Sequence, residues 1–163
     1  MFPFCLRAPR AHELPEVVAL IRALAEFEQL PGPDEAAAAR FAADYGATPP
    51  RFELLVAEQG GRLVAYALFF PTYSTFRAQP SLFLEDLFVL PEARGQGLGT
   101  AFLVELARLA QERGCGRFEW LVLDWNVGAI EVYRRLGAAV LPEWRLCRIE
   151  GAGLSGLAKR RGE

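Results

Sequence analysis

The sequence predicts a single α/β domain, and three observations support this fold class. A chain of 163 residues has the length of one domain. Short apolar runs that suit strands alternate with longer segments in which apolar residues recur at helical spacing. Three glycines, Gly95, Gly97 and Gly99, separate an apolar run from a helical one. This arrangement is typical of a turn between a strand and a helix.

Composition excludes several classes of protein. Hydrophobic residues make up 52% of the chain and the net charge is −2, which predicts a globular protein with no nucleic-acid partner. No apolar run is long enough to cross a membrane, and the N-terminus lacks a signal-peptide layout, so we expect a cytoplasmic protein. The three cysteines, Cys5, Cys115 and Cys147, are too far apart to indicate a metal site or a disulfide framework.

The first half of the chain is predicted to form a strand, two helices and a hairpin. Apolar residues at three- and four-residue steps indicate the first helix, and a Pro-Gly-Pro break separates it from an alanine-rich second helix. The sequence Gln59-Gly60-Gly61 indicates a tight turn between two strands. In order, the predicted strand, helices and hairpin strands cover residues 2–6, 13–29, 34–45, 54–58 and 63–72.

The second half is predicted to contain a loop at 74–81, a buried strand at 82–89, the glycine turn and a long helix at 98–113. Gly114 is a suitable terminator for that helix. A strand at 118–123, a helix at 126–136 and strands at 139–141 and 144–149 follow. The remaining residues, 151–163, are predicted to form a polar, glycine-rich tail with a frayed end.

The glycine turn has a use in phosphate binding. Backbone N–H groups that gather at a helix start, together with the helix dipole, form an anion site, and Arg94 can add a charge-assisted contact. A P-loop requires a lysine that is absent here, and a dinucleotide fingerprint requires glycine where Thr100 stands. Neither common nucleotide motif therefore fits.

The pattern Arg94-x-x-Gly97-x-Gly99 resembles the pyrophosphate motif of the GCN5-related N-acetyltransferases (GNAT), which bind acetyl-CoA. Residues 85–89 (Glu-Asp-Leu-Phe-Val), 124–126 (Asp-Trp-Asn) and 133–138 (Tyr-Arg-Arg-Leu-Gly-Ala) are closest to the diamine (spermidine/spermine) and thialysine branch. The resemblance extends over about residues 6–149. It implies one domain over residues 1–163, with a core over about residues 4–150, a tail at 151–163, and a mixed sheet of about seven strands with helices on both faces.

The resemblance also implies which residues bind acetyl-CoA. The backbone at the end of the central strand would bind the pantetheine arm, the glycine turn would bind the pyrophosphate, and the helix at 126–136 would add contacts. The implied residues are Leu87, Phe88, Val89, Arg94, Gly95, Gln96, Gly97, Leu98, Gly99, Thr100, Asn126, Ala129 and Tyr133. A metal is not implied.

Two residues are candidates for catalysis. Tyr133 matches the family's general acid, because a phenol with an ordinary pKa of about 10 keeps a proton that it can give to a thiolate. Glu85 matches a residue that helps deprotonate the amine through water. Glu85 and its neighbour Asp86 are expected on opposite faces of the strand.

The implied acceptor site is an acidic groove with an aromatic wall, which suits an elongated cation. Its residues are Phe27, Glu28, Glu85, Asp86, Asn126 and Trp144. Arg77 departs from the polyamine enzymes and weakens the case for spermidine.

We therefore predict an acetyl-CoA-dependent N-acetyltransferase that acts directly on a primary amine of a small molecule, a polyamine, diamine or thialysine-like compound. An amino acid, or a protein N-terminus or lysine, stays open as the acceptor. A non-catalytic acyl-CoA-binding regulator is the alternative from another class. The branch implies a homodimer, which the apolar residues 139–149 permit.

Overall fold

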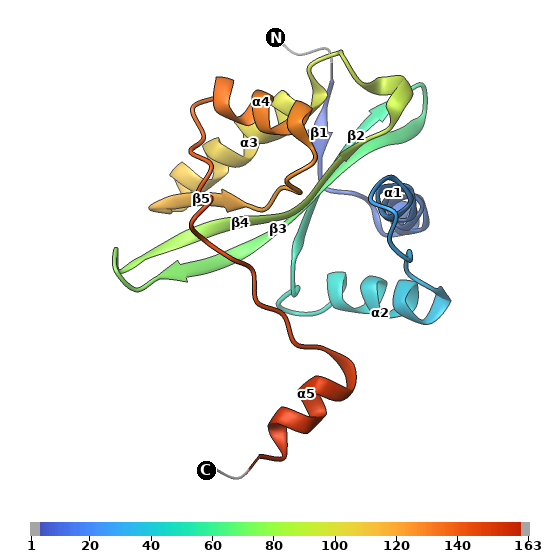
Figure 1. The fold of residues 1–163 in the computed structure, drawn as a ribbon. Helices are drawn as coiled ribbons and strands as arrows, with labels where there is room; N and C mark the ends of the chain where they lie inside the picture. Colours follow the sequence, from blue (N-terminus) through green and yellow to red (C-terminus); the bar gives the residue numbers. More distant parts are fainter. Residues whose placement is uncertain (1–3, 161–163) are drawn as a thin grey trace. The chain divides into compact units, whose positions relative to one another are not determined.

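The computed structural model describes residues 4–160, and the chain forms two compact units, Met1–Leu121 and Val122–Glu163. The first unit contains a sheet covered by helices, and the second contains two helices (Figure 1). The predicted domain over residues 1–163 therefore stays a prediction.

The sheet of the first unit is mixed, as predicted. Its strands follow in the order β1 (Leu6–Arg7), β2 (Glu53–Gln59), β3 (Arg62–Ser74), β4 (Gln79–Val89) and β5 (Arg117–Trp120). The first four pair antiparallel with their neighbours, and β5 pairs parallel to β4. Among the described residues the sheet has five strands, whereas about seven were expected.

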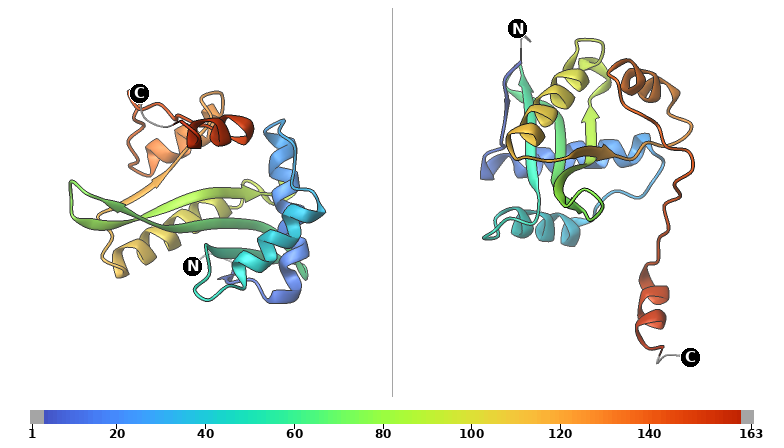
Figure 2. Two further views of the ribbon diagram at one scale, coloured as in Figure 1. Left: turned by 90° about the horizontal axis from the view of Figure 1, so that it is seen from below. Right: turned by 90° about the vertical axis from the view of Figure 1, so that its left-hand side faces the viewer.

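Helices cover both faces of this sheet. The helical elements of the first unit are η1 (Ala11–Glu13), α1 (Leu14–Phe27), α2 (Glu35–Tyr45), η2 (Pro91–Ala93) and α3 (Leu98–Glu112). α1 and α3 lie on opposite faces (Figure 2), so residues pointing either way from β3 are buried. Tyr66 and Leu68 belong to the core with α1, and their neighbours Ala65 and Ala67 are also fully buried.

The main core joins α1 to three strands. Its buried members are Leu14, Val17, Leu20, Leu54, Val56, Leu63, Tyr66, Leu68 and Phe88. Residues of α2, including Phe41 and Tyr45, pack against the edge of this cluster. The Asp34 side chain caps α2, because it accepts a hydrogen bond from the Ala37 N–H at 2.7 Å.

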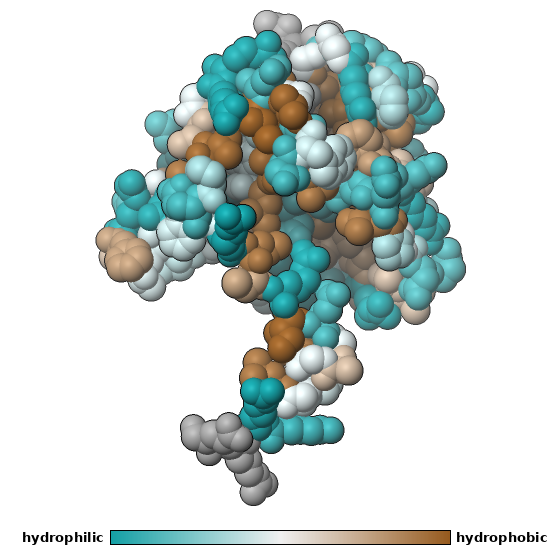
Figure 3. All heavy atoms as spheres, viewed as in Figure 1, coloured by the Kyte–Doolittle hydropathy of each residue, from teal (hydrophilic) through white to brown (hydrophobic). Residues whose placement is uncertain are grey.

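The second unit contains α4 (Val127–Arg135) and α5 (Gly151–Ala158). The strands predicted at 139–141 and 144–149 are wrong, because these residues form no ladder in the described structure. An apolar run suits a strand, but a strand exists only where a partner satisfies its backbone. No helix was predicted in the tail, and residues 151–158 of it form α5. There Leu154 and Leu157 lie three positions apart on α5, whose segment carries hydrophobic atoms (Figure 3).

Three further boundaries differ from the sequence prediction. The strand expected at 2–6 is described as β1 at Leu6–Arg7, and residues 2–3 of that prediction lie outside the described residues. The loop expected at 74–81 shortens to a turn at 75–78, since β3 runs to Ser74 and β4 begins at Gln79. Pro80 is accommodated near the start of β4, where its carbonyl accepts from the Gly116 N–H. The strand expected to reach residue 123 ends at Trp120.

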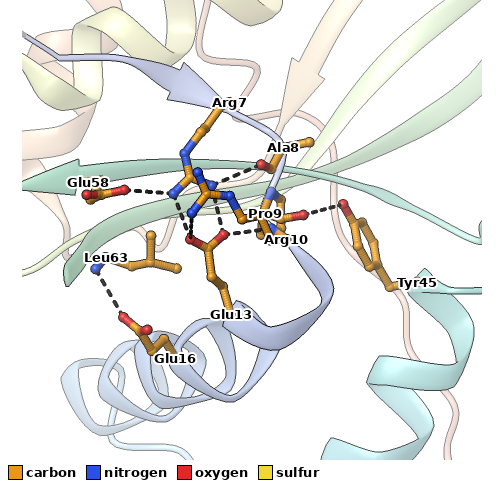
Figure 4. A network of polar contacts seen from close by, with 9 residues as sticks. All are labelled: Arg7, Ala8, Pro9, Arg10, Glu13, Glu16, Tyr45, Glu58 and Leu63. Carbon is orange, nitrogen blue, oxygen red and sulfur yellow. Dashed lines mark hydrogen bonds and ion pairs between the residues drawn. The ribbon is translucent and has the colours of Figure 1, made fainter. Parts of the chain in front are cut away.

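A polar network fixes β1 to the start of α1 and to β2 (Figure 4). The Arg7 guanidinium donates to both carboxylate oxygens of Glu13 at 2.7 Å and to Glu58 at 2.8 Å. The Arg10 N–H donates to the same Glu13 carboxylate at 2.6 Å. The hydrogen bonds from Arg7 and then Arg10 lower the pKa of the buried Glu13 to about 2.

Glu13→Gln should lower the melting temperature at neutral pH and flatten its acid dependence. Because the folded pKa of Glu13 lies below its ordinary value of 4.5, its ionised form stabilises the fold above that value. This contribution is lost as the pH falls toward about 2. Thermal melts from about pH 7 to about pH 2 should therefore show the wild-type and variant curves converging in acid.

Glu112→Gln is the matched control, because Glu112 pairs with Arg108 on the exposed face of one helix. Its melting temperature should stay close to that of the wild type. Parallel curves for Glu13→Gln and wild type at all pH values would contradict the linkage.

Candidate functional site

A β-bulge interrupts β4 at its two acidic residues. Leu68 of β3 pairs with Asp86 and Phe69 pairs with Leu84, which leaves Glu85 as the extra residue. The bulge interrupts the regular alternation on which the expectation of opposite faces for Glu85 and Asp86 depends, so that expectation stays a prediction. The charge of Glu85 acts on Asp86 and raises the pKa of that carboxyl.

The Asp86 carboxyl has an unusual environment. Burial raises its pKa to about 6, and the negative charges of Glu85 and Glu28 act in the same direction. A hydrogen bond from the Tyr66 hydroxyl to Asp86 Oδ2, 3.1 Å long, opposes this shift by stabilising the ionised form. Glu28 caps the end of α1. The arrangement brings three of the predicted acceptor-site acids into electrostatic contact.

The second half of β4 has an open edge. β5 pairs with β4 only from Ser81 to Leu84, and in the described structure no strand continues this pairing from Glu85 to Val89 (Figure 1). On the other edge, β3 pairs with β4 as far as Val89. Backbone N–H and C=O groups at the open edge can therefore bind an extended ligand.

This edge leads to the glycine turn and the start of α3. Gly95 and Gly97 have φ values of +76° and +84°, a conformation that glycine adopts at little cost. The first helical hydrogen bond runs from Ala101 N–H to the Gly97 carbonyl, so the N–H groups of residues 98–100 lack helical acceptors. A Cβ added at Gly99 would meet nothing within 4 Å. Donors and free space therefore fit a phosphate group.

Arg94 bridges the turn, β4 and α1. Its Nε donates to the Val89 carbonyl at 2.9 Å. Its guanidinium carbon lies 5.0 Å from the Phe27 ring centroid and 5.6 Å from that of Phe88, within the range of cation–π contact. The side chain of Gln96 accepts a hydrogen bond from Gln59 at 3.1 Å. The phosphate contact of Arg94 stays a prediction.

The remaining candidates belong to the second unit. Asn126 caps α4 as predicted, with its Oδ1 accepting from the Ala129 N–H at 3.3 Å. Tyr133 lies on α4, and burial raises the pKa of its phenol. Trp144 is 74% exposed in a segment without secondary structure. The roles of these residues in binding and catalysis stay predictions.

Sequence reasoning missed Tyr66. The apolar run at 63–72 predicts a strand around this tyrosine but does not single out its hydroxyl. The available signal was general: a buried tyrosine needs a hydrogen-bond partner for its O–H group. Here that partner is a site acid.

Within residues 4–160, no group of three or more His, Cys, Asp or Glu side chains could hold a metal ion. None of the helices formed by these residues combines the length and apolar character that crossing a bilayer requires.

Two named acetyltransferases are similar to this chain in sequence. Thialysine N-epsilon-acetyltransferase of Mus musculus is 37% identical over 166 aligned positions, covering 95% of this chain and 97% of that protein. L-ornithine N5-acetyltransferase of Arabidopsis thaliana is 42% identical over 97 residues, covering 60% of this chain and 42% of that protein.

Among solved structures, an integron cassette protein from the mobile metagenome of V. cholerae has the same fold. Its TM-score is 0.83 at 23% identity, covering 98% of this chain and 99% of that one. A family model described as the acetyltransferase (GNAT) family matches residues 17–138. On this match and the identity to full-length relatives, the chain belongs to the acetyltransferase (GNAT) family.

Proposed function

We propose that this protein transfers an acetyl group from acetyl-CoA to a primary amine of a small molecule, of the polyamine, diamine or thialysine type. The observation that carries the proposal is the organisation of β4. Two acids, Glu85 and Asp86, lie at its bulge, and the edge that β5 leaves unpaired runs from there to Val89. That edge leads to the glycine turn at the start of α3. One strand thus supplies groups for both substrates.

Acetyl-CoA fits the groups present on this strand and turn. The backbone of Leu87, Phe88 and Val89 would bind the pantetheine amides at the open edge. The N–H groups at the start of α3 would bind the pyrophosphate, and their donors and free space support this assignment. We propose the following binding residues: Leu87, Phe88, Val89, Arg94, Gly95, Gln96, Gly97, Leu98, Gly99, Thr100, Asn126, Ala129 and Tyr133.

The acids suit a cationic acceptor. Glu28, Glu85 and Asp86 place negative charge around one point of the sheet. We propose Phe27, the last residue of α1 before Glu28, as the aromatic contact of the acceptor. An amine with a pKa near 10 is a cation at neutral pH and would be attracted there. We propose Asn126 and Trp144 as further acceptor contacts.

The chemistry requires two proton movements. When bound, acetyl-CoA supplies the acetyl group as an activated thioester. The family resemblance assigns removal of the amine proton to Glu85, by way of water. It assigns protonation of the departing sulfur to the phenol of Tyr133, and the raised pKa of that phenol keeps it protonated at neutral pH.

Arg77 does not argue against a polycation. It lies in the turn between Ser74 and Gln79. With a rise of about 3.3 Å per residue, roughly 20 Å of strand separates Gln79 from Glu85. Its charge is therefore well beyond a Debye length from the acids at physiological salt.

The names of the relatives, a thialysine and an ornithine acetyltransferase, favour an amino-acid side-chain amine among the candidates.

Thiol release from acetyl-CoA across an amine panel tests the proposal. The panel contains spermidine, spermine, putrescine, thialysine, lysine, ornithine and a short peptide. Turnover with one or more of the small amines is expected. Turnover with the peptide alone would favour protein acetylation, and acetyl-CoA binding without any turnover would favour a non-catalytic regulator.

We also propose a homodimer in the cytoplasm. Residues 139–149 carry strand-compatible apolar side chains without a strand partner in the described structure, and a second copy could supply one. Sedimentation analysis should give the mass of two chains at micromolar concentration, whereas a monomer at all concentrations would contradict the dimer.

A further inference from the structure

We propose that Tyr66 is a positioning residue for acetyl transfer: its hydroxyl holds the Asp86 carboxylate at the bulge of β4, and Asp86, rather than Glu85, receives the proton that the acceptor amine loses. This inference rests on the proposed function and refines the proton transfer within it. Asp86 would then be a catalytic residue.

The geometry at Tyr66 is fixed by packing. Its side chain is fully buried in the core between α1 and the sheet, and Phe88 is its register partner on β4. A phenol hydroxyl in such a core is costly without a partner. It donates to Asp86 Oδ2 at 3.1 Å. Among the described residues no hydrogen bond to the second carboxylate oxygen, Oδ1, is present. The bond to Tyr66 therefore fixes the carboxyl group while Oδ1 can accept from an amine.

The bulge explains why this acid can reach a ligand. Bulges re-aim side chains and are frequent beside active sites. Here the bulge lies at Glu85, one residue before Asp86, where the pairing of β4 with β5 has ended. The carboxyl of Asp86 is half-buried, so it is shielded from bulk water without being closed off. Glu85 is exposed.

Three groups change the pKa of Asp86, each from a different element. They are Glu85 on β4, Glu28 at the end of α1 and Tyr66 on β3. The carboxylates of Glu85 and Glu28 attract a cationic amine and favour the protonated form of Asp86. The Tyr66 hydroxyl favours the ionised form. With a pKa of about 6, Asp86 is mostly ionised at neutral pH, and its basicity is better matched to proton transfer than that of an ordinary carboxylate.

The step balances. An N–H bond of the ammonium breaks, an O–H bond forms on Asp86 Oδ1, and the freed lone pair of nitrogen attacks the thioester carbonyl. The carbon–sulfur bond breaks as Tyr133 supplies a proton to sulfur. A second N–H bond of the attacking nitrogen then breaks, because the amide keeps only one, and its proton restores the Tyr133 phenol. Asp86 loses its proton to water. The products are the amide and the thiol, with one net proton released.

The test is the pH profile of kcat/KM with the best amine of the panel. In Tyr66→Phe the acid limb should move to higher pH by about one unit, because a hydrogen bond that favours the carboxylate is lost. Glu28→Gln should move the limb to lower pH, because a negative charge is removed. Asp86→Asn should lose the limb and about 10²–10⁴-fold of kcat/KM.

Tyr45→Phe is the matched control. Tyr45 is a half-buried residue of α2, and its hydroxyl donates to the Pro9 carbonyl at 3.3 Å. Loss of this hydroxyl should leave the pH profile of kcat/KM unchanged. A Tyr66→Phe profile that superimposes on the wild type would overturn the inference. So would a limb that survives in Asp86→Asn and disappears in Glu85→Gln.

A measurement without turnover separates this inference from the proposed function. NMR titration of labelled aspartate carboxyls should give Asp86 a higher pKa in Tyr66→Phe than in wild type, in a protein whose spectrum stays folded. An unchanged titration would overturn the positioning role of Tyr66 whatever the enzyme acetylates. If the wild type shows no turnover but the Asp86 titration shifts in Tyr66→Phe, acetyl transfer and the role of Asp86 as proton acceptor would both be refuted. The contact between Tyr66 and Asp86 would still stand.

Discussion

Tyr133→Phe is expected to lower kcat by about 10²–10⁴-fold, the usual contribution of a general acid. The substitution removes one hydroxyl and keeps the ring. Because burial raises the pKa of this phenol above its ordinary value of 10.0, the hydroxyl keeps its proton through the neutral range and is available to the departing sulfur. Acetyl-CoA affinity should change little, since the ring contacts remain.

Steady-state kinetics and calorimetric acetyl-CoA binding measure the two quantities separately. Tyr73→Phe, at an exposed position of β3, is the control and should match the wild type in both. Full activity of Tyr133→Phe would exclude the phenol as the acid and would move the search for a proton donor to solvent or to the acceptor itself.

Gly97→Val should abolish acetyl-CoA binding while the protein stays folded. Gly97 precedes α3 at a φ of +84°, where a side chain costs roughly 1–2 kcal/mol. A branched side chain there would also occupy the space beside the free N–H groups at the helix start. The cost in free energy of unfolding is small against a typical total of about 5–15 kcal/mol, so the loss should fall on the ligand.

Gly114→Val separates backbone strain from loss of the site. Gly114 has a φ of +68° and follows the opposite end of α3, so its replacement carries a similar conformational cost. This variant should bind acetyl-CoA as the wild type does. Retained binding in Gly97→Val, measured by calorimetry, would show that the phosphate assignment is incorrect.

The sequence was informative wherever one short segment carries the whole signal. The start of α2 was predictable because Asp34 is a strong capping residue, and the end of α3 because Gly114 adopts a positive φ. The glycine turn was placed correctly because its three glycines follow a proline-terminated strand. In each case local backbone chemistry determines the structure.

Features that depend on partners distant in the sequence were not predictable. The bulge at Glu85 exists because β3 and β4 slip by one residue, and neither strand contains that information alone. The start of β4 at Gln79 was hidden by polar residues and Pro80. The segment 144–149 was predicted to form a strand, for which the described structure supplies no neighbour.

Within the site, residue types were easier to predict than their relations. Glu28, Glu85 and Asp86 were identified as candidates, but the effect of the first two on the pKa of Asp86 and the contact with Tyr66 depend on how α1, β3 and β4 pack. Alternation of side chains along a strand fails where a bulge intervenes. A sequence pattern cannot reveal that exception.

Transfer of label from acetyl-labelled CoA to the amine panel tests the central claim most directly, with product mass and thiol release followed together. The proposed function predicts one labelled acetyl group on a primary amine of a small molecule for each thiol released. Thiol release without a labelled small amine, or binding of acetyl-CoA with neither product, would contradict the claim that this protein is a small-molecule N-acetyltransferase.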